Sequence, residues 1–188
     1  MVSNVSSLMT VFNGWDSHQV SLVKAITPLT PEQLAWRPAP NLRSVGQVVG
    51  HIIAGRVDWF KRMQAPGSAE LTNQIYTWDQ DPHGNKYMQT DTIAGDRTEL
   101  VRLLEASWEM IQRTLSEWTV ADLAVTYRHT WRQNTYAISR QWTIWRIMCH
   151  DIHHGGELAV MLGIQGIPIP ELGDAGGHLT PTPPAESL

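Results

Sequence analysis

Hydrophobic residues recur every three or four positions along four long segments of the chain. In each segment this spacing places the hydrophobic side chains on one face of an α-helix. We therefore predict long helices over about residues 5–26, 45–63, 97–118 and 139–162. The pattern indicates an all-α fold, a four-helix bundle, in which ligand sites are commonly built from side chains on facing helices.

Capping signals mark where two of the predicted helices begin. Thr30 and Gln33 have the spacing of a capping box, with Pro31 between them at the first helical position. Ser44 and Gln47 repeat the box at the start of the 45–63 helix. The first box predicts one short extra helix ahead of the 45–63 helix.

Three other segments lack a sustained period. Residues 64–91 are polar and contain proline and glycine, which predicts a long loop that could cover a substrate. Within 119–138, the stretch "LAVTYRHTW" is compatible with a short strand. The C-terminal end is rich in proline and glycine, so we expect a bundle domain over 1–168 and an irregular tail over 169–188.

The composition narrows the class of protein. The 188 residues contain one cysteine, which excludes an internal disulfide, and the first residues lack the basic start and apolar run of a secretory signal. No stretch approaches the roughly 18 consecutive apolar residues of a membrane span. We expect a cytoplasmic protein with no membrane partner. The net charge of −4, with scattered basic residues, argues against a nucleic-acid partner.

Two histidines interrupt the hydrophobic stripe of the last helix. His150 and His154 lie one turn apart in the row formed by Ile147, His150, His154, Leu158 and Met161. Imidazoles that face a core need hydrogen-bond partners or a metal ion. His51, on the inward arc of the 45–63 helix, is the candidate third ligand. Three neutral imidazoles suit zinc, nickel, iron or manganese and leave a position for water or substrate, although satisfied core histidines give the same pattern.

For some residues around these histidines the sequence offers alternative roles. We expect His153 to face solvent and Cys149 to be a small core residue. Asp151 and Glu157 either orient imidazoles from behind or belong to a solvated helix face. Trp59, near the face of His51, is a candidate pocket wall. The sequence assigns no residue to catalysis.

The last predicted helix carries a second hydrophobic row on its other side. Trp145, Met148, Ile152 and Ala159 form this row. A helix that is apolar nearly all round is buried on both faces. We therefore expect a homodimer, which a monomer mass in light scattering would contradict.

Two stretches give the chain a resemblance to a known family. "SVGQVVGHIIAGRVDWF" and "CHDIHHGGELAVMLGIQGIP" are similar to the metal-binding helices of the DinB-like (YfiT-like) superfamily of four-helix bundles. The likeness extends over roughly residues 5–168 and implies metal ligands at His51, His150 and His154. Where the family often has an arginine after the last ligand, this chain has Gly155, so an anion-binding role at that position lacks its residue.

The resemblance also implies candidate functions. Some relatives are transferases or isomerases that use a low-molecular-weight thiol such as mycothiol or bacillithiol. We therefore expect a metal-dependent transferase with a divalent transition metal ion, a thiol co-substrate and a small-molecule substrate. One alternative is a metal-dependent hydrolase at the same site, with Glu157 or Asp151 as base. The other is a non-catalytic, stress-associated metal-binding module.

Overall fold

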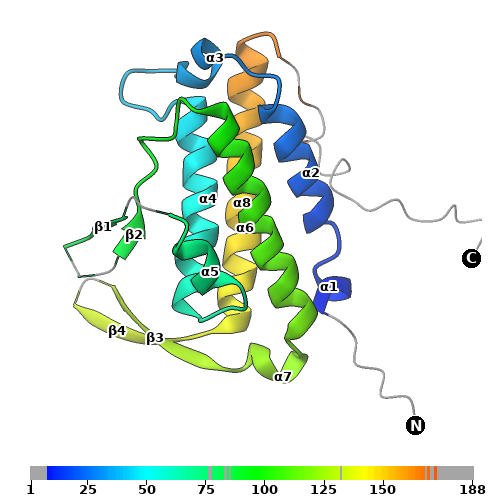
Figure 1. Ribbon diagram of the computed structural model, residues 1–188, viewed down its shortest axis with the longest axis vertical. Coiled ribbons are helices and arrows are strands. Elements are labelled where there is room, and N and C mark those ends of the chain that lie inside the picture. The colour runs from blue at the N-terminus through cyan, green and yellow to red at the C-terminus, as the bar shows by residue number, and fades with distance from the viewer. Residues whose placement is uncertain are drawn as a thin grey trace, which may run out of the picture.

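The computed structural model describes residues 8–75, 78–82, 84, 86–131, 133–167, 169 and 172. Long helices run side by side in this part of the chain (Figure 1): α2 (Trp15–Ile26), α4 (Val45–Arg62), α6 (Arg97–Glu117) and α8 (Arg140–Ile164). Helices α4 and α2 each contact both α6 and α8. The helices therefore enclose a shared core, as the hydrophobic stripes predicted.

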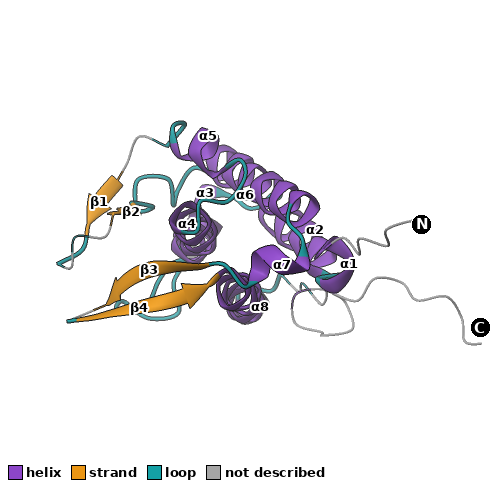
Figure 2. Cartoon of the chain, turned by 90° about the horizontal axis from the view of Figure 1, so that it is seen from below, coloured by secondary structure: helices purple, strands orange, loops and turns teal. Residues whose placement is uncertain are grey.

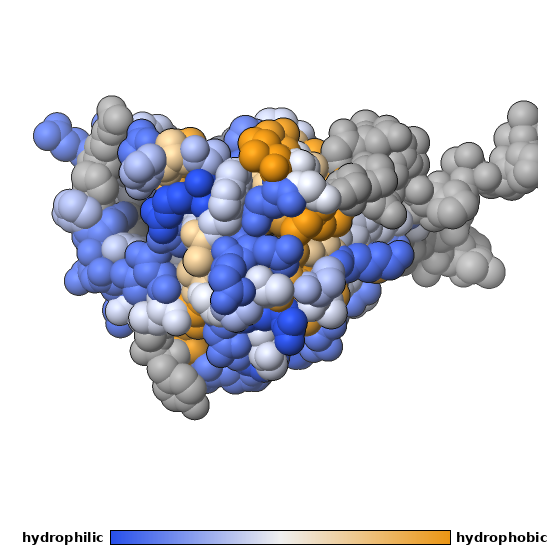
Figure 3. All heavy atoms as spheres, turned by 90° about the horizontal axis from the view of Figure 1, so that it is seen from above, coloured by the Kyte–Doolittle hydropathy of each residue, from blue (hydrophilic) through white to orange (hydrophobic). Residues whose placement is uncertain are grey.

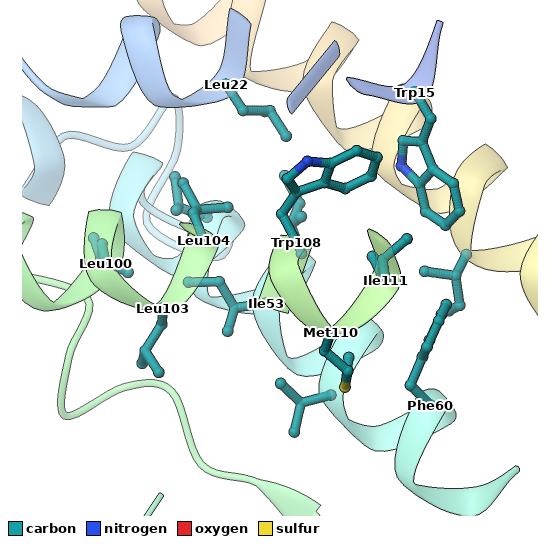
Figure 4. Close-up of a cluster of buried hydrophobic side chains, with 14 of the residues drawn as sticks. Trp15, Leu22, Ile53, Phe60, Leu100, Leu103, Leu104, Trp108, Met110 and Ile111 are labelled. Carbon is teal, nitrogen blue, oxygen red and sulfur yellow. The ribbon is translucent and has the colours of Figure 1, made fainter. Parts of the chain in front are cut away.

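The core is filled by large hydrophobic side chains from facing helices. Figure 4 shows Trp15 and Leu22 from α2 pointing toward Leu104 and Trp108 from α6, with Ile53 from α4 close by. The rings of Trp15 and Trp108 meet edge to face, with centroids 5.7 Å apart. Burial of such side chains is the main favourable term that holds the helices together.

The first predicted helix is interrupted. It consists of α1 (Leu8–Val11) and α2, separated by a turn at Gly14, whose φ of 99° is left-handed and is adopted readily by glycine. Residues 5–7, where we expected the helix to begin, lie outside the described residues. Both predicted capping boxes are confirmed, at Thr30 before α3 (Pro31–Ala35) and at Ser44 before α4.

The connections contain more structure than the sequence predicted. Residues 64–91 include α5 (Ser68–Thr72) and a hairpin of β1 (Trp78–Gln80) and β2 (Lys86–Met88). Residues 119–138 include α7 (Val120–Leu123) and most of a second hairpin.

This second hairpin joins β3 (Thr126–Trp131) and β4 (Asn134–Ser139), which pair antiparallel with Thr126 opposite Ser139 (Figure 2). The fold is therefore helix-rich, as expected, but it also contains two small antiparallel sheets, so the all-α class describes only its helical part. The short strand expected within residues 123–131 is present as β3, whereas β4 is short and largely exposed and has no hydrophobic period long enough to predict it.

An ion pair between α4 and α8 is completely buried. Arg56 and Asp151 are each 0% exposed, and Arg56 Nε donates to Asp151 Oδ2 at 2.8 Å. The indole N–H of Trp15 donates to the same oxygen at 2.8 Å, which adds α2 to the network. Arg56 also donates to the side chain of Gln19 on α2 and to the carbonyl of Leu104 on α6. One guanidinium thus connects α2, α4, α6 and α8.

The second hydrophobic row of α8 is open to solvent at Trp145 and Ile152, whereas Met148 and Ala159 are half-buried and pack against the core. Trp145 and Ile152 are 56% and 43% exposed, and Val160 is 64% exposed. Seen from above, the molecule is largely hydrophilic with separate hydrophobic patches (Figure 3). The expected homodimer stays a prediction. None of the described helices is both long enough and apolar enough to cross a membrane.

Replacing Asp151 with asparagine should lower the free energy of unfolding by about 3–5 kcal/mol, because it leaves the buried Arg56 charge without a negatively charged partner. Urea denaturation monitored by circular dichroism measures this loss. Arg102→Gln is the control, because Arg102 pairs with Glu99 on the surface of α6. The control should lose at most about 1 kcal/mol, and an equally small loss in Asp151→Asn would contradict the structural role of the pair.

Candidate metal centre

Three histidines from two helices meet on the facing sides of α4 and α8. His51 comes from α4, and His150 and His154 come from α8. Each offers a ring nitrogen, and these nitrogens all lie within 4.8 Å of one another. The Nε2 atoms of His51 and His150 lie 3.2 Å apart. The structure therefore brings together the three side chains that the sequence selected.

Features near these residues position the rings. His150 directly precedes Asp151, and Gly55 directly precedes Arg56, so the buried ion pair fixes the height of α4 against α8 at this level. Gly55 lies one turn after His51, and a Cβ atom there would be 2.7 Å from Cε1 of His150. The missing side chain of Gly55 therefore leaves the space that the His150 ring occupies.

Burial keeps two of the imidazoles uncharged. It lowers the pKa of His51 to about 3, and electrostatic interactions with Arg43, His150 and His154 lower it further. Burial also lowers the pKa of His154, which the neighbouring Glu157 partly opposes. A neutral imidazole has a free lone pair, the form that binds metal ions.

Glu157 has the orienting role that the sequence offered as one alternative. Its Oε2 lies 2.7 Å from Nδ1 of His154, so a proton on Nδ1 is favoured and Nε2 is left as the acceptor. Asp151 acts differently, because its Oδ2 binds Arg56 and its Oδ1 lies 3.9 Å from Nδ1 of His150. That distance is too long for a direct hydrogen bond.

The donor set fits a divalent transition metal ion. Nitrogen ligands at about 2.0–2.1 Å from a tetrahedral zinc ion are about 3.3–3.4 Å apart, close to the 3.2 Å between His51 and His150. Among the described residues, the cluster consists of three histidines without a carboxylate or thiolate. Three protein ligands leave at least one position for an exogenous ligand.

A polar pocket of about 490 Å³, the metal-side pocket, opens beside the histidines. His51 and His150 form part of its wall, and residues 87–91 form another part, so the segment predicted to cover a substrate does border the site. The sequence did not single out Arg146 and Asp58, which also line it. Helical spacing could have identified both residues, because Arg146 precedes His150 by one turn and Asp58 follows His51 by two turns on the same helices.

The carboxyl group of Asp58 lines this pocket and has a raised pKa. Burial raises its pKa to about 6, although Arg62 and a hydrogen bond from the backbone N–H of Met88 oppose the increase. A carboxyl group with this pKa exchanges protons close to neutral pH.

The structure also places the other residues that the sequence singled out near the three histidines. His153 is exposed, as expected, and its ring touches that of His154 with centroids 4.9 Å apart. Cys149 is half-buried rather than a core residue. Trp59 lines the metal-side pocket, as the sequence indicated.

The fold and the site together define a helix-rich protein with a three-histidine centre between two long helices. The sequence profile of the DinB superfamily matches residues 15–158, and the chain belongs to this superfamily. Its fold is similar to the crystal structure of a DinB-like protein from Bacillus cereus ATCC 10987, with a TM-score of 0.57 and 17% identity. The match covers 83% of this chain and 91% of that one. No curated protein matches the sequence.

The metal-free protein should lose stability as the pH falls from about 6.5 toward about 3. In this window the unfolded chain protonates His51 near its ordinary pKa of 6.5, whereas the folded chain does so only near 3. The unfolded state then binds more protons, so the free energy of unfolding decreases with falling pH. Urea denaturation of chelator-treated protein across this range measures the slope.

The comparison of variants isolates the contribution of His51. His154 and His129, whose pKa values are also lowered, act in the same direction, whereas the raised pKa of Asp58 acts in the opposite one. His51→Gln should therefore have a smaller slope than the wild type, and the control Gly163→Ala, which removes no titratable group, should not. Equal slopes in wild type and His51→Gln would refute the assignment.

Proposed function

We propose that this chain is a DinB-like four-helix bundle in which His51, His150 and His154 hold one divalent transition metal ion. The observation that carries the proposal is the convergence of these imidazoles, from two helices, beside an open pocket. Zinc, nickel, iron and manganese are the candidates, and imidazole nitrogen favours the first three.

We further propose that the protein is a transferase that uses a low-molecular-weight thiol. A divalent ion supplies Lewis-acid chemistry, because it lowers the pKa of a thiol or water that binds to it. The sequence contains one cysteine, Cys149, which is not among the residues that line the metal-side pocket. A thiol nucleophile would therefore come from a co-substrate.

The residues in and around the pocket have different roles in the proposed reaction. Asp58, with a pKa of about 6, is mostly ionised at neutral pH and accepts the proton that the thiol releases. Arg43 lines the same pocket and attracts an anionic co-substrate. Asp151 does not serve as a base, because it is fully buried and paired with Arg56. Glu157 is already engaged with His154.

Wild-type protein purified without chelator should contain about one transition metal ion per chain, because three histidines supply the ligands. Inductively coupled plasma mass spectrometry measures the content, and His51→Gln and His150→Gln should fall well below that of the wild type. Gly55→Ala should lower metal affinity about 10- to 100-fold by displacing the ring of His150.

Gly163→Ala is the matched control, because a Cβ atom there meets nothing within 4 Å. Far-UV circular dichroism should show that every variant is folded. Wild-type protein that binds no ion even after reconstitution with each candidate metal would refute the metal site.

Metal-loaded protein should accelerate the conjugation of monochlorobimane with a matched thiol, tested with cysteine, glutathione, bacillithiol and mycothiol. Asp58→Asn should keep its metal but lose about 100- to 10,000-fold in rate, the usual contribution of a general base. Asp91→Asn, on the same pocket wall, is the matched carboxylate control and should keep most of the rate.

Fluorescence of the bimane conjugate gives the rate. If no thiol reacts faster with loaded protein than without it, the transferase is refuted. Ester hydrolysis by that sample would then identify the hydrolase alternative. If hydrolysis is also absent and chelation lowers the melting temperature, the ion is structural.

A further inference from the structure

A second and larger cavity adjoins the metal-side pocket. It has a volume of about 740 Å³ and lies between the β3–β4 hairpin and helices α4 and α8. Figure 2 shows the hairpin next to these two helices. Trp59 and Arg146 line both cavities, so a molecule held in the larger one borders the three-histidine centre.

Two arginines give this cavity a positive wall. The guanidinium groups of Arg62 and Arg146 lie 5.0 Å and 5.1 Å from the ring centroid of Trp59. Neither group has a carboxylate partner within 4.0 Å in the part of the chain that the structure describes. Among the described lining residues, Asp81 is the single carboxylate against these two cations. The excess of positive over negative charge in this cavity favours an anionic ligand.

Aromatic side chains form the rest of the wall. Trp142 meets Trp59 edge to face at 5.7 Å, and His129 packs on Trp59 at 4.9 Å. From the hairpin, Trp131 and Tyr136 line the cavity and are 51% and 46% exposed. Indole and phenol faces bind flat, apolar groups by stacking and by edge-to-face contact. The cavity therefore offers both a cationic end and an aromatic surface.

We propose that this cavity binds a flat aromatic carboxylate, with the carboxylate on Arg62 and Arg146 and the ring system against Trp59 and Trp142. Guanidinium groups pair with carboxylates through two parallel hydrogen bonds, which favours this group over a neutral polar one. As the site of the second substrate, the cavity rests on the metal-dependent function proposed above. As a binding site it does not depend on the metal.

Isothermal titration calorimetry with 2-naphthoate and its neutral analogue 2-naphthamide tests the proposal. Wild-type protein should bind 2-naphthoate at least tenfold more tightly than 2-naphthamide. The double variant Arg62→Gln/Arg146→Gln should lose at least tenfold in affinity for naphthoate and little for naphthamide. Arg102→Gln, on the surface of α6 and paired with Glu99, is the charge-matched control and should bind as the wild type does.

Two further variants separate charge from stacking. Arg62→Lys/Arg146→Lys keeps both charges and should retain more naphthoate affinity than the glutamine pair, even if both pairs are less stable. Trp142→Leu should weaken naphthoate and naphthamide alike, because it removes the shared aromatic contact. Equal affinity for the two probes in the wild type, or undiminished naphthoate binding by the glutamine pair, would overturn the proposal.

The metal-free variant His51→Gln distinguishes this proposal from the preceding one. Arginine-dependent naphthoate binding that persists in His51→Gln supports the cavity whatever the outcome of the metal experiments. Naphthoate binding that disappears in His51→Gln and survives in the glutamine pair places the carboxylate at the metal instead. That result would overturn the aromatic carboxylate cavity and leave the metal centre standing.

Discussion

The buried ion pair between Arg56 and Asp151 is the interaction on which the arrangement of the site depends. Burial by itself raises the pKa of Asp151, but the charge of Arg56, followed by hydrogen bonding, outweighs it and holds that pKa below its ordinary value. The charges therefore persist in the core because each has partners. A shift of α4 by one helical turn, about 5.4 Å, would break the pair. It would also carry His51 farther than the distances that now separate the ring nitrogens.

The three-histidine cluster consequently depends on polar contacts that lie behind it. The ion pair sets the relative height of α4 and α8, Gly55 makes room for the ring of His150, and Glu157 orients His154. Burial then keeps His51 and His154 neutral. Each contribution is small or indirect, but together they hold nitrogen donors close to the separations that a metal ion requires.

The two adjoining cavities differ in the chemistry of the residues that line them. The pocket beside the histidines is polar and contains Asp58, whereas the cavity under the β3–β4 hairpin is aromatic and contains Arg62. Trp59 and Arg146 belong to both. The match to the DinB superfamily and the similar crystal structure support the helical framework. The bound molecules proposed above are inferred from the side chains that line the two cavities of this chain.

The sequence alone determined the long helices, both capping boxes and the three histidines, because helical period and capping are local properties that neighbouring residues encode. It also offered Glu157 as an orienting residue, three positions from His154. It did not predict the Arg56–Asp151 pair, because the partners are 95 residues apart and each is typical of an exposed helix face. A short strand at the position of β3 was also expected, but the pairing of strands into two hairpins, the break at Gly14 and the cavity between β3–β4 and the helices were decided by tertiary structure. Packing between distant segments, which no local period records, selects which polar side chains are buried together and which aromatic ones form a pocket.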